Sequence, residues 1–191
     1  MIRNRILHLT MSLLVFSSAG GEDRKSIREI REASRPGDDH ALLNPLVGEW
    51  KVRMQYRVRP DANPEMAMGK AEFQWILGQR FLEQIFEGKG AAGALEGRGL
   101  IGYDNLMNHY VGTWIDSMNS GMTWSTGKAH PQERVIHFDA AKTDPLTAEA
   151  TDYDVYLRIL NTNQVQYIVS TKSPDPNERI VVLQMDYARR R

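Results

Sequence analysis

The chain has 191 residues, with 24 lysine and arginine residues against 24 acidic residues and no cysteine. This length predicts one folded domain, and a formal net charge of zero gives no sign of the basic surface that nucleic-acid binding requires. The lack of cysteine excludes disulfides, a thiolate nucleophile and cysteine-ligated zinc. A hydrophobic fraction of 41% is typical of an ordinary globular protein rather than of a disordered chain.

The first residues have the order of a secretory signal peptide. Arg3 and Arg5 precede the apolar run 6–16, and Ser17-Ser18-Ala19 then supplies the small residues that a signal peptidase reads. The apolar run is too short to cross a hydrocarbon core of about 30 Å as a helix. We therefore expect residues 1–19 to be a signal peptide and the protein to be periplasmic or secreted, without a membrane span once the signal is removed. An uncleaved, tethered form is the alternative.

Residues 20–39 predict a short polar helix that acts as an arm or linker. Ile27 and Ile30 form a narrow apolar stripe, and Glu and Arg residues spaced by three and four favour side-chain pairing. Arg35-Pro36-Gly37 ends the helix. Residues 40–191 are expected to form the folded domain.

From Gly48 onward, apolar and polar residues alternate with period two. In the first segment one face carries Trp50, Val52, Met54, Tyr56 and Val58, while the other carries only Lys, Arg and Gln, which predicts a half-buried antiparallel strand. Similar segments, separated by Gly, Asn, Asp, Ser and Pro turn residues, are Ala67–Leu77, Phe81–Gly88, Leu95–Tyr103, His109–Ser117, Met122–Ala129, Arg134–Phe138, Thr151–Leu160, Gln164–Thr171 and Arg179–Tyr187.

No crossover helix separates these segments, which argues against a parallel sheet. An open meander of about ten strands would leave two exposed edges, and closure into a barrel removes both. We therefore predict an all-β protein, an antiparallel up-and-down β-barrel of about ten strands preceded by a short N-terminal helical arm. The interior of such a barrel holds packed side chains or one small ligand.

Gly48-Glu49-Trp50 resembles the Gly-x-Trp opening of lipocalin-type, or calycin-like, barrels. Further motifs lie between His40 and Gly127. On this set of motifs, residues 40–187 resemble a bacterial domain-of-unknown-function family of small exported proteins with such a barrel. The added motifs are Leu46–Trp50, Gly78–Leu82, Gly99–Asp104, Tyr110 and Trp114–Ser117. The resemblance implies a fold and supplies no catalytic residues.

Some neighbouring calycin-like families bind haem through a histidine. In this chain His109 and His137 lie in predicted strands, and His40 and His130 lie in turns. A lone strand histidine is more often a surface or core residue than a ligand, so no cofactor is expected.

Gly97-Arg98-Gly99-Leu100-Ile101-Gly102 matches the dinucleotide-binding pattern. The chemistry of that pattern requires a helix to begin at the glycines, so that free amides meet the pyrophosphate. Here a turn at Tyr103-Asp104-Asn105 and another strand follow. We therefore expect the glycines to let a barrel strand bend.

The candidate ligand-binding residues are aromatic, with a few polar anchors. The four tryptophans lie in different predicted strands, where they either line a cavity or simply fill the barrel. If Trp114 points inward, Asp116 does too, and a buried carboxylate needs a partner such as Arg80 or Arg98. Asp116 is then either a ligand anchor or a cap for the turn with Ser117 and Asn119. The full predicted set is Trp50, Tyr56, Trp75, Arg80, Tyr103, Trp114, Asp116 and Trp124.

Other candidate groups favour no chemistry. Glu83 with Glu87, and Asp152 with Asp154, share strand faces that are solvated by default rather than placed across a sugar. The histidines near Asp139 lack metal-site spacing, so no metal is expected.

These observations predict an exported protein that binds a small, largely apolar ligand inside the barrel. Two alternatives stay open. One is an enzyme acting on such a ligand with Asp116 as general base, and the other is a packed barrel that serves as a structural or interaction module of the cell envelope.

Overall fold

The computed structural model describes residues 21–91, 93–144, 148–173, 175 and 177–190. Helix α1 (Gly21–Ala33) belongs to one unit of the chain, and the residues from Ser34 onward form another. The helix confirms the predicted arm, with Ile27 and Ile30 both exposed. The predicted signal peptide, residues 1–19, lies outside the described residues. Among the helices that are described, none combines the length and the apolar character of a membrane span.

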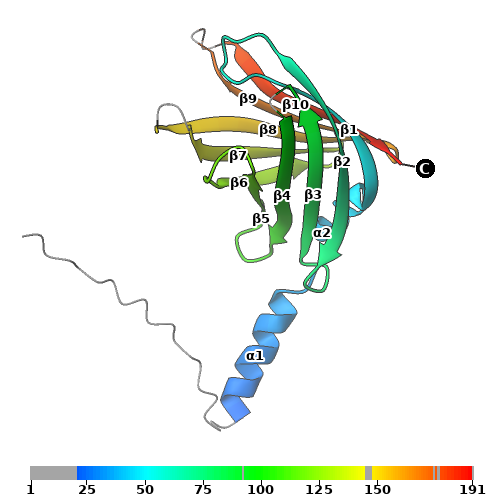
Figure 1. Ribbon diagram of the computed structural model, residues 1–191. Coiled ribbons are helices and arrows are strands. Elements are labelled where there is room, and N and C mark those ends of the chain that lie inside the picture. The colour runs from blue at the N-terminus through cyan, green and yellow to red at the C-terminus, as the bar shows by residue number, and fades with distance from the viewer. Residues whose placement is uncertain (1–20, 92, 145–147, 174, 176, 191) are drawn as a thin grey trace, which may run out of the picture. The chain divides into compact units, whose positions relative to one another are not determined.

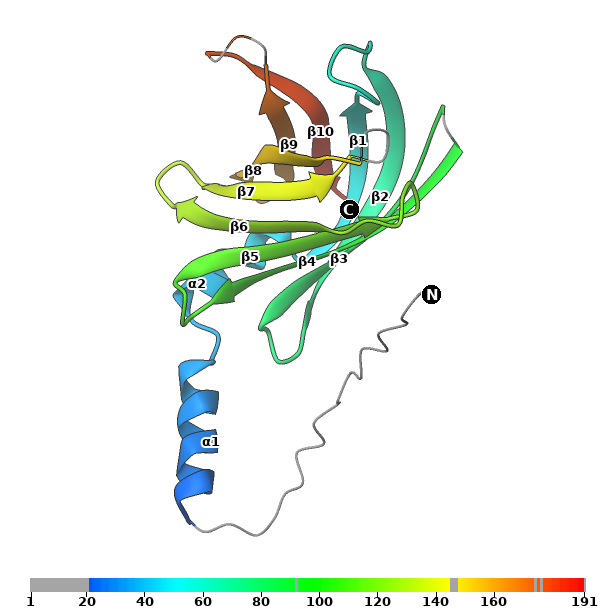
Figure 2. The same ribbon diagram turned by 90° about the vertical axis from the view of Figure 1, so that its left-hand side faces the viewer.

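The second unit is a closed antiparallel barrel, as predicted. Its strand order is β1-β10-β9-β8-β7-β6-β5-β4-β3-β2, so that the first and last strands pair (Figures 1 and 2). The strands are β1 (Gly48–Tyr56), β2 (Glu65–Ile76), β3 (Phe81–Gly90), β4 (Gly93–Asp104), β5 (His109–Asp116), β6 (Thr123–His130), β7 (Val135–Thr143), β8 (Ala150–Asn161), β9 (Gln164–Lys172) and β10 (Arg179–Arg189).

Most strand boundaries lie within two residues of the sequence expectation, and the ends of β1 and β7 are the informative differences. Strand β1 ends at Tyr56, where its ladder with β2 also ends at Glu65, and Val58 is exposed instead of sharing the core face. Strand β7 continues past Phe138 to Thr143. Its last residues are alanines and polar residues with weak strand propensity, and pairing with both β6 and β8 makes them a strand.

The alternation of β1 sets the inside of the barrel. Trp50 and Val52 are fully buried and Met54 nearly so, while the residues between them are exposed. The antiparallel ladders carry this alternation round the barrel. The buried apolar residues are Leu43, Leu46, Trp50, Val52, Met54, Ala67, Ala71, Phe73, Leu82, Phe86, Tyr110, Ile136, Phe138, Ala140, Val155, Leu157, Val165, Met185 and Tyr187.

A plug formed by α2 (Asp38–Ala41) and the 3-10 helix η1 (Asn44–Leu46) closes one end of the barrel. Leu43 and Leu46 are fully buried. The Nε1–H of Trp50 donates to the carbonyl oxygen of Leu46 at 2.7 Å, and the hydroxyl of Tyr110 donates to that of Asp39 at 2.8 Å. Strands far apart in the sequence therefore hold the plug.

His40 is the polar residue inside the plug. Its ring meets Tyr103 edge-on with the ring centroids 5.9 Å apart, and its Nδ1 accepts a hydrogen bond from the backbone N–H of Gly37. Burial lowers the pKa of His40, which keeps the imidazole neutral at neutral pH.

Arg189, the last residue of β10, fixes the plug to the first strand. Its guanidinium lies 4.2 Å above the Trp50 ring and donates to the backbone oxygens of Val47, Pro45 and Thr162, each at 2.7 Å. Gly48 has φ +117°, and a Cβ there would lie 2.9 Å from the same guanidinium. A glycine therefore precedes Glu49-Trp50 for both backbone and steric reasons.

We predict that Arg189→Ala lowers the free energy of unfolding by about 3 kcal/mol, because it removes a cation–π contact and three charge-assisted hydrogen bonds. The matched control is Arg190→Ala, which removes only an exposed ion pair with Glu49 and should cost less than about 1 kcal/mol. Urea unfolding of both variants measures the difference. Equal effects would contradict the role of Arg189.

Two tyrosines in the interior, Tyr167 and Tyr187, stay neutral well above the pH at which a tyrosine usually ionises. The amide of Gln84 donates to the Tyr187 hydroxyl at 3.0 Å, and that hydroxyl donates to the sulfur of Met185 at 3.4 Å. Burial raises the pKa of Tyr167 to about 12 and also raises the pKa of Tyr187.

We therefore predict alkaline unfolding between about pH 10 and pH 12. In the unfolded chain a tyrosine ionises near pH 10, whereas the folded protein keeps these two protonated to higher pH. Their contribution to stability is complete below pH 10 and is lost as the pH rises through the raised pKa values. Denaturant unfolding at a series of pH values measures this loss, which Tyr167→Phe should reduce; an unchanged pH dependence in that variant would contradict the assignment.

Candidate functional site

Six of the eight candidate ligand-binding residues face the interior, and they separate into two groups. Trp50, Trp75 and Tyr103 lie at the plugged end, where the Trp75 Nε1–H donates to the side-chain oxygen of Asn44 at 2.9 Å. Trp50 and Tyr103 contact the plug through Leu46 and His40. These three side chains hold the plug in place.

The second group lies in the unplugged half of the barrel and centres on Asp116. Its Oδ2 accepts the Nε1–H of Trp114 at 3.0 Å and lies 3.5 Å from Nζ of Lys142, while its Oδ1 accepts the backbone N–H of Met118 at 2.9 Å. The amide of Asn119 is 3.5 Å away. Asp116 therefore points into the barrel and also caps the following turn, as the turn-cap interpretation of the sequence expected.

The partner of Asp116 is Lys142, and not Arg80 or Arg98. Arg80 lies in the β2–β3 turn and donates to the backbone oxygen of Leu77, and Arg98 faces outward, 3.9 Å from Glu83. Sequence reasoning missed Lys142 because it ended β7 at Phe138, five residues too early.

Trp114 lies directly over the backbone of two glycines. A Cβ at Gly97 would be 2.2 Å from its Cζ2, and one at Gly99 would be 2.9 Å from its Cε3. A Cβ at Gly102 would be 2.6 Å from the Phe81 ring. The glycines that matched a dinucleotide-binding pattern thus lie in a barrel strand, β4, as the sequence favoured, and they make room for aromatic rings.

We predict that Gly97→Ala displaces the Trp114 indole and costs about 1–3 kcal/mol of stability through overpacking. Gly37→Ala is the control, because a Cβ there meets no atom within 4 Å. Urea unfolding gives the cost, and tryptophan emission reports the displacement. If Gly97→Ala behaves like the control, the close packing of Trp114 on β4 is wrong.

Two tyrosines complete the unplugged half. The hydroxyl of Tyr56 donates to Oε2 of Glu65 at 2.8 Å. Tyr153 lies on β8, the strand next to the one that carries Lys142. It pairs with Ala140, and Lys142 pairs with Thr151. Burial raises the pKa of Tyr153, and the nearby charge of Asp144 adds to this. The half opposite the plug therefore combines aromatic rings with one ion pair.

Trp124 does not line the interior. Trp114 pairs with Thr123, which places Thr123 inward and the next residue outward, and the Trp124 side chain is 64% exposed. The sequence contained this signal, because Trp124 alternates in phase with Thr126 and Lys128 rather than with the small residues between them.

Trp124 borders a groove of about 940 Å³ on the outside of the barrel. The lining includes one row of residues that pair with one another across β5–β8, namely Gly112, Ser125, Ala140 and Tyr153. It also includes the outward-facing residues on either side of this row. Those outward residues are mostly apolar, with two threonines, on β3–β6 and mostly charged on β7–β10. The complete lining is Phe81, Leu100, Val111, Gly112, Thr113, Met122, Trp124, Ser125, Thr126, Asp139, Ala140, Ala141, Asp152, Tyr153, Asp154, Lys172 and Arg179.

The charged end of this groove contains a cluster that the sequence did not indicate. Ligand atoms of His137, Asp139 and Asp154 all lie within 4.8 Å of one another, a set that could hold a cation. Asp154 is already engaged, 3.3 Å from Nε2 of His137 and 2.6 Å from the guanidinium of Arg179. The cluster depends on the register of β7 with β8, which sequence spacing does not reveal.

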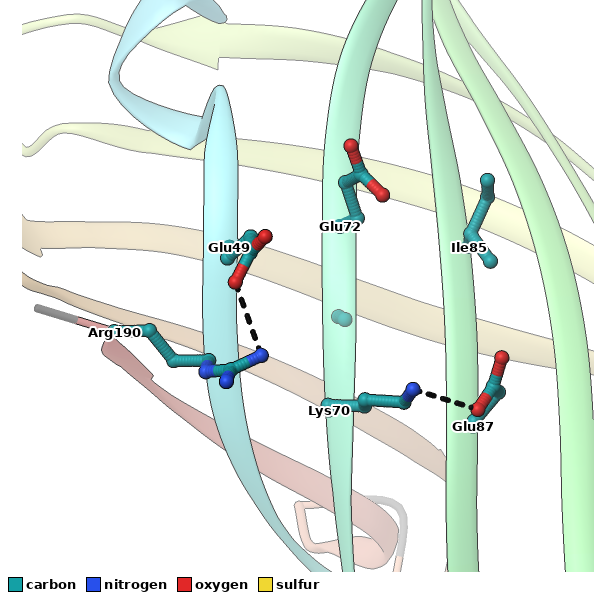
Figure 3. Close-up of a pocket in the computed structure, with 7 residues that line it drawn as sticks. Glu49, Lys70, Glu72, Ile85, Glu87 and Arg190 are labelled. Atoms are coloured by element: carbon teal, nitrogen blue, oxygen red, sulfur yellow. Dashed lines mark ion pairs between the residues drawn. The ribbon is translucent and has the colours of Figure 1, made fainter.

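A smaller depression of about 110 Å³ lies on β1–β3 (Figure 3). Its charges neutralise one another, since Lys70 lies 3.0 Å from Glu87 and Arg190 lies 3.0 Å from Glu49. The paired side chains are about half exposed or more, so this surface behaves as a solvated face, as expected for Glu87.

Residues 35–189 match the model of a family described as "Protein of unknown function (DUF1579)". The chain belongs to the DUF1579 family. The match spans the plug and all ten strands of this DUF1579 protein. It confirms the resemblance seen in the sequence. No protein with a curated function matches the chain.

Three solved structures are similar to this DUF1579 barrel at low sequence identity. The S-type phycobiliprotein lyase CPES from Guillardia theta superposes with a TM-score of 0.54 at 8% identity, covering 84% of this chain and 97% of the lyase. A de novo designed fluorescence-activating β-barrel has a TM-score of 0.37 at 19% identity, covering 75% and 93% of the two chains. A redesigned β-barrel has a TM-score of 0.41 at 14% identity, covering 78% and 96%. The likeness to the lyase shows a shared fold.

Proposed function

We propose that this DUF1579 protein is exported and binds a small, largely apolar molecule in the unplugged half of its barrel. The Asp116–Lys142 pair is the polar anchor, and Trp114 and Tyr56 form part of the wall. The barrel fold is consistent with binding a small ligand, because barrels of this size hold either packed side chains or one such molecule.

The Asp116–Lys142 pair is the observation that carries the proposal. The two side chains are only 11% and 21% exposed and lie beside aromatic rings inside a largely apolar barrel. Withdrawing both charges from water costs several kcal/mol for each ion, and two well-packed apolar side chains would stabilise the fold as well or better. Charges retained in such a place are better explained by recognition of a ligand.

Energetics also require an anchor of this kind. A ligand that loses about 300 Å² of apolar surface gains roughly 7 kcal/mol, and association costs about 4–15 kcal/mol in lost freedom of movement. The two nearly cancel, so a small apolar molecule needs a polar contact for selective binding.

Catalysis by Asp116 as a general base is less favoured by the same geometry. Trp114, Lys142, Met118 and Asn119 all direct N–H groups at its two oxygens. Oxygen lone pairs that already accept hydrogen bonds from several donors are poorly placed to receive a proton from a substrate. The arrangement suits holding a ligand better than taking its proton.

We predict that protein purified from its native envelope carries a reproducible bound mass in native mass spectrometry, on a chain shortened by residues 1–19. The double variant Asp116→Asn/Lys142→Met should lose that mass and should bind the neutral apolar probe N-phenyl-1-naphthylamine at least about tenfold more weakly. Glu72→Gln, on the outer face, is the matched control and should bind as the wild type does. A clean apo mass with no probe binding would support the packed-barrel alternative instead.

A further inference from the structure

We propose a second binding site, independent of the interior one: the outer groove of about 940 Å³ binds an amphipathic cation. The apolar tail of the ligand lies over β4, β5 and β6, and its positively charged head lies against the acidic residues of β7 and β8. The groove volume is in the range that holds a drug-sized molecule.

The first half of the groove is an exposed apolar surface. Met122 is 42% exposed and the Trp124 indole 64% exposed, and they continue into Leu100, Val111 and Phe81. A contiguous apolar patch of this kind, bordered by charged residues, marks a binding surface rather than an ordinary exposed side chain. Tryptophan supplies a large apolar face with little loss of conformational entropy when a ligand covers it.

The second half of the groove has an excess of negative charge. Asp139, Asp152 and Asp154 face Lys172 and Arg179, and Arg179 already pairs with Asp154. Asp139 pairs directly across the ladder with Asp154, an arrangement of like charges that destabilises a sheet. Among the described residues, no ion pair involves Asp139 or Asp152. A cationic head group placed between them would relieve the repulsion.

The register of the strands places the apolar half and the acidic half of the groove at a separation that one ligand can span. Trp124, Ala141 and Asp152 occupy neighbouring positions on β6, β7 and β8, so the indole and the carboxylate are two strands apart, or about 10 Å. Ala141 between them is small and exposed, which leaves the path along the groove open. A head group at Asp152 is thus continuous with a tail over Trp124.

The same surface offers two other chemistries that the test must separate. An amphipathic anion would use Lys172 and Arg179, which lie opposite each other on β9 and β10. A metal ion alone would use His137 with Asp139 and Asp154. The pairing of Arg179 with Asp154 opposes both, because it removes one cation from an anion and one carboxylate from a metal.

The test titrates the whole mature protein with dodecyltrimethylammonium below its micelle concentration, using calorimetry. Dodecanoate tests whether the head group must be positively charged, and tetramethylammonium tests whether the apolar tail is needed. Zn²⁺ tests whether the site binds a metal ion. We expect dodecyltrimethylammonium to bind at least about tenfold more tightly than each of the two organic probes, and Zn²⁺ to leave its affinity unchanged.

Variants locate the site. Asp139→Asn/Asp152→Asn and Trp124→Ala should each weaken binding of dodecyltrimethylammonium at least about fivefold. The matched controls are Glu72→Gln and Met68→Ala, an exposed acid and an exposed apolar residue on β2, which should change nothing. All five positions are exposed on the outer face, and circular dichroism verifies that each variant folds.

Equal or tighter binding of dodecanoate would overturn the proposal, as would equal binding of tetramethylammonium or competition by Zn²⁺. Full affinity in the groove variants would also overturn it. Asp116→Asn separates this site from the interior one, because it should weaken N-phenyl-1-naphthylamine binding and leave dodecyltrimethylammonium binding unchanged. Loss of dodecyltrimethylammonium binding in that variant would assign the probe to the interior and reject the groove.

Discussion

The contact between Trp50 and Arg189 is the constraint on which the rest of the barrel depends. It joins the first strand to the last, and the same guanidinium binds the backbone of the segment that enters β1. One stacked pair therefore completes the sheet and also holds the plug over its end. The Asp116–Lys142 pair lies in the opposite half of the barrel, away from this plug.

Aromatic rings packed on glycine backbone form a second theme of the fold. Trp114 covers Gly97 and Gly99, and Phe138 covers Gly127, where a Cβ would lie 2.7 Å from the ring. Each glycine lets a large ring approach the opposing strand closely, which bends the sheet and fills the interior. The same rule accounts for an apparent nucleotide motif in a protein whose fold has no place for one.

Much of the fold followed from local patterns, whereas the sites depend on register. Period two identified all ten strands, and the turn residues between them implied antiparallel closure. The inward position of Trp114 and Asp116 followed from the same alternation. The outward face of Trp124 was also present in the alternation of β6, whereas the pairing of Lys142 with Asp116 required knowing where β7 ends and how the strands pair. Cross-strand pairing joins residues that are distant in sequence, so spacing alone does not reveal it.

The position of Arg189 at the end of β10 also affects how the chain reaches its folded state. Strand β1 and its plug are synthesised long before β10, the strand that pairs with β1 in the closed sheet. Until then the sheet is open along β1 and β9, with unpaired backbone at both edges. Closure of the barrel therefore waits for β10, and loss of the last few residues of this strand would remove the Trp50–Arg189 contact and shorten the ladder that closes the sheet.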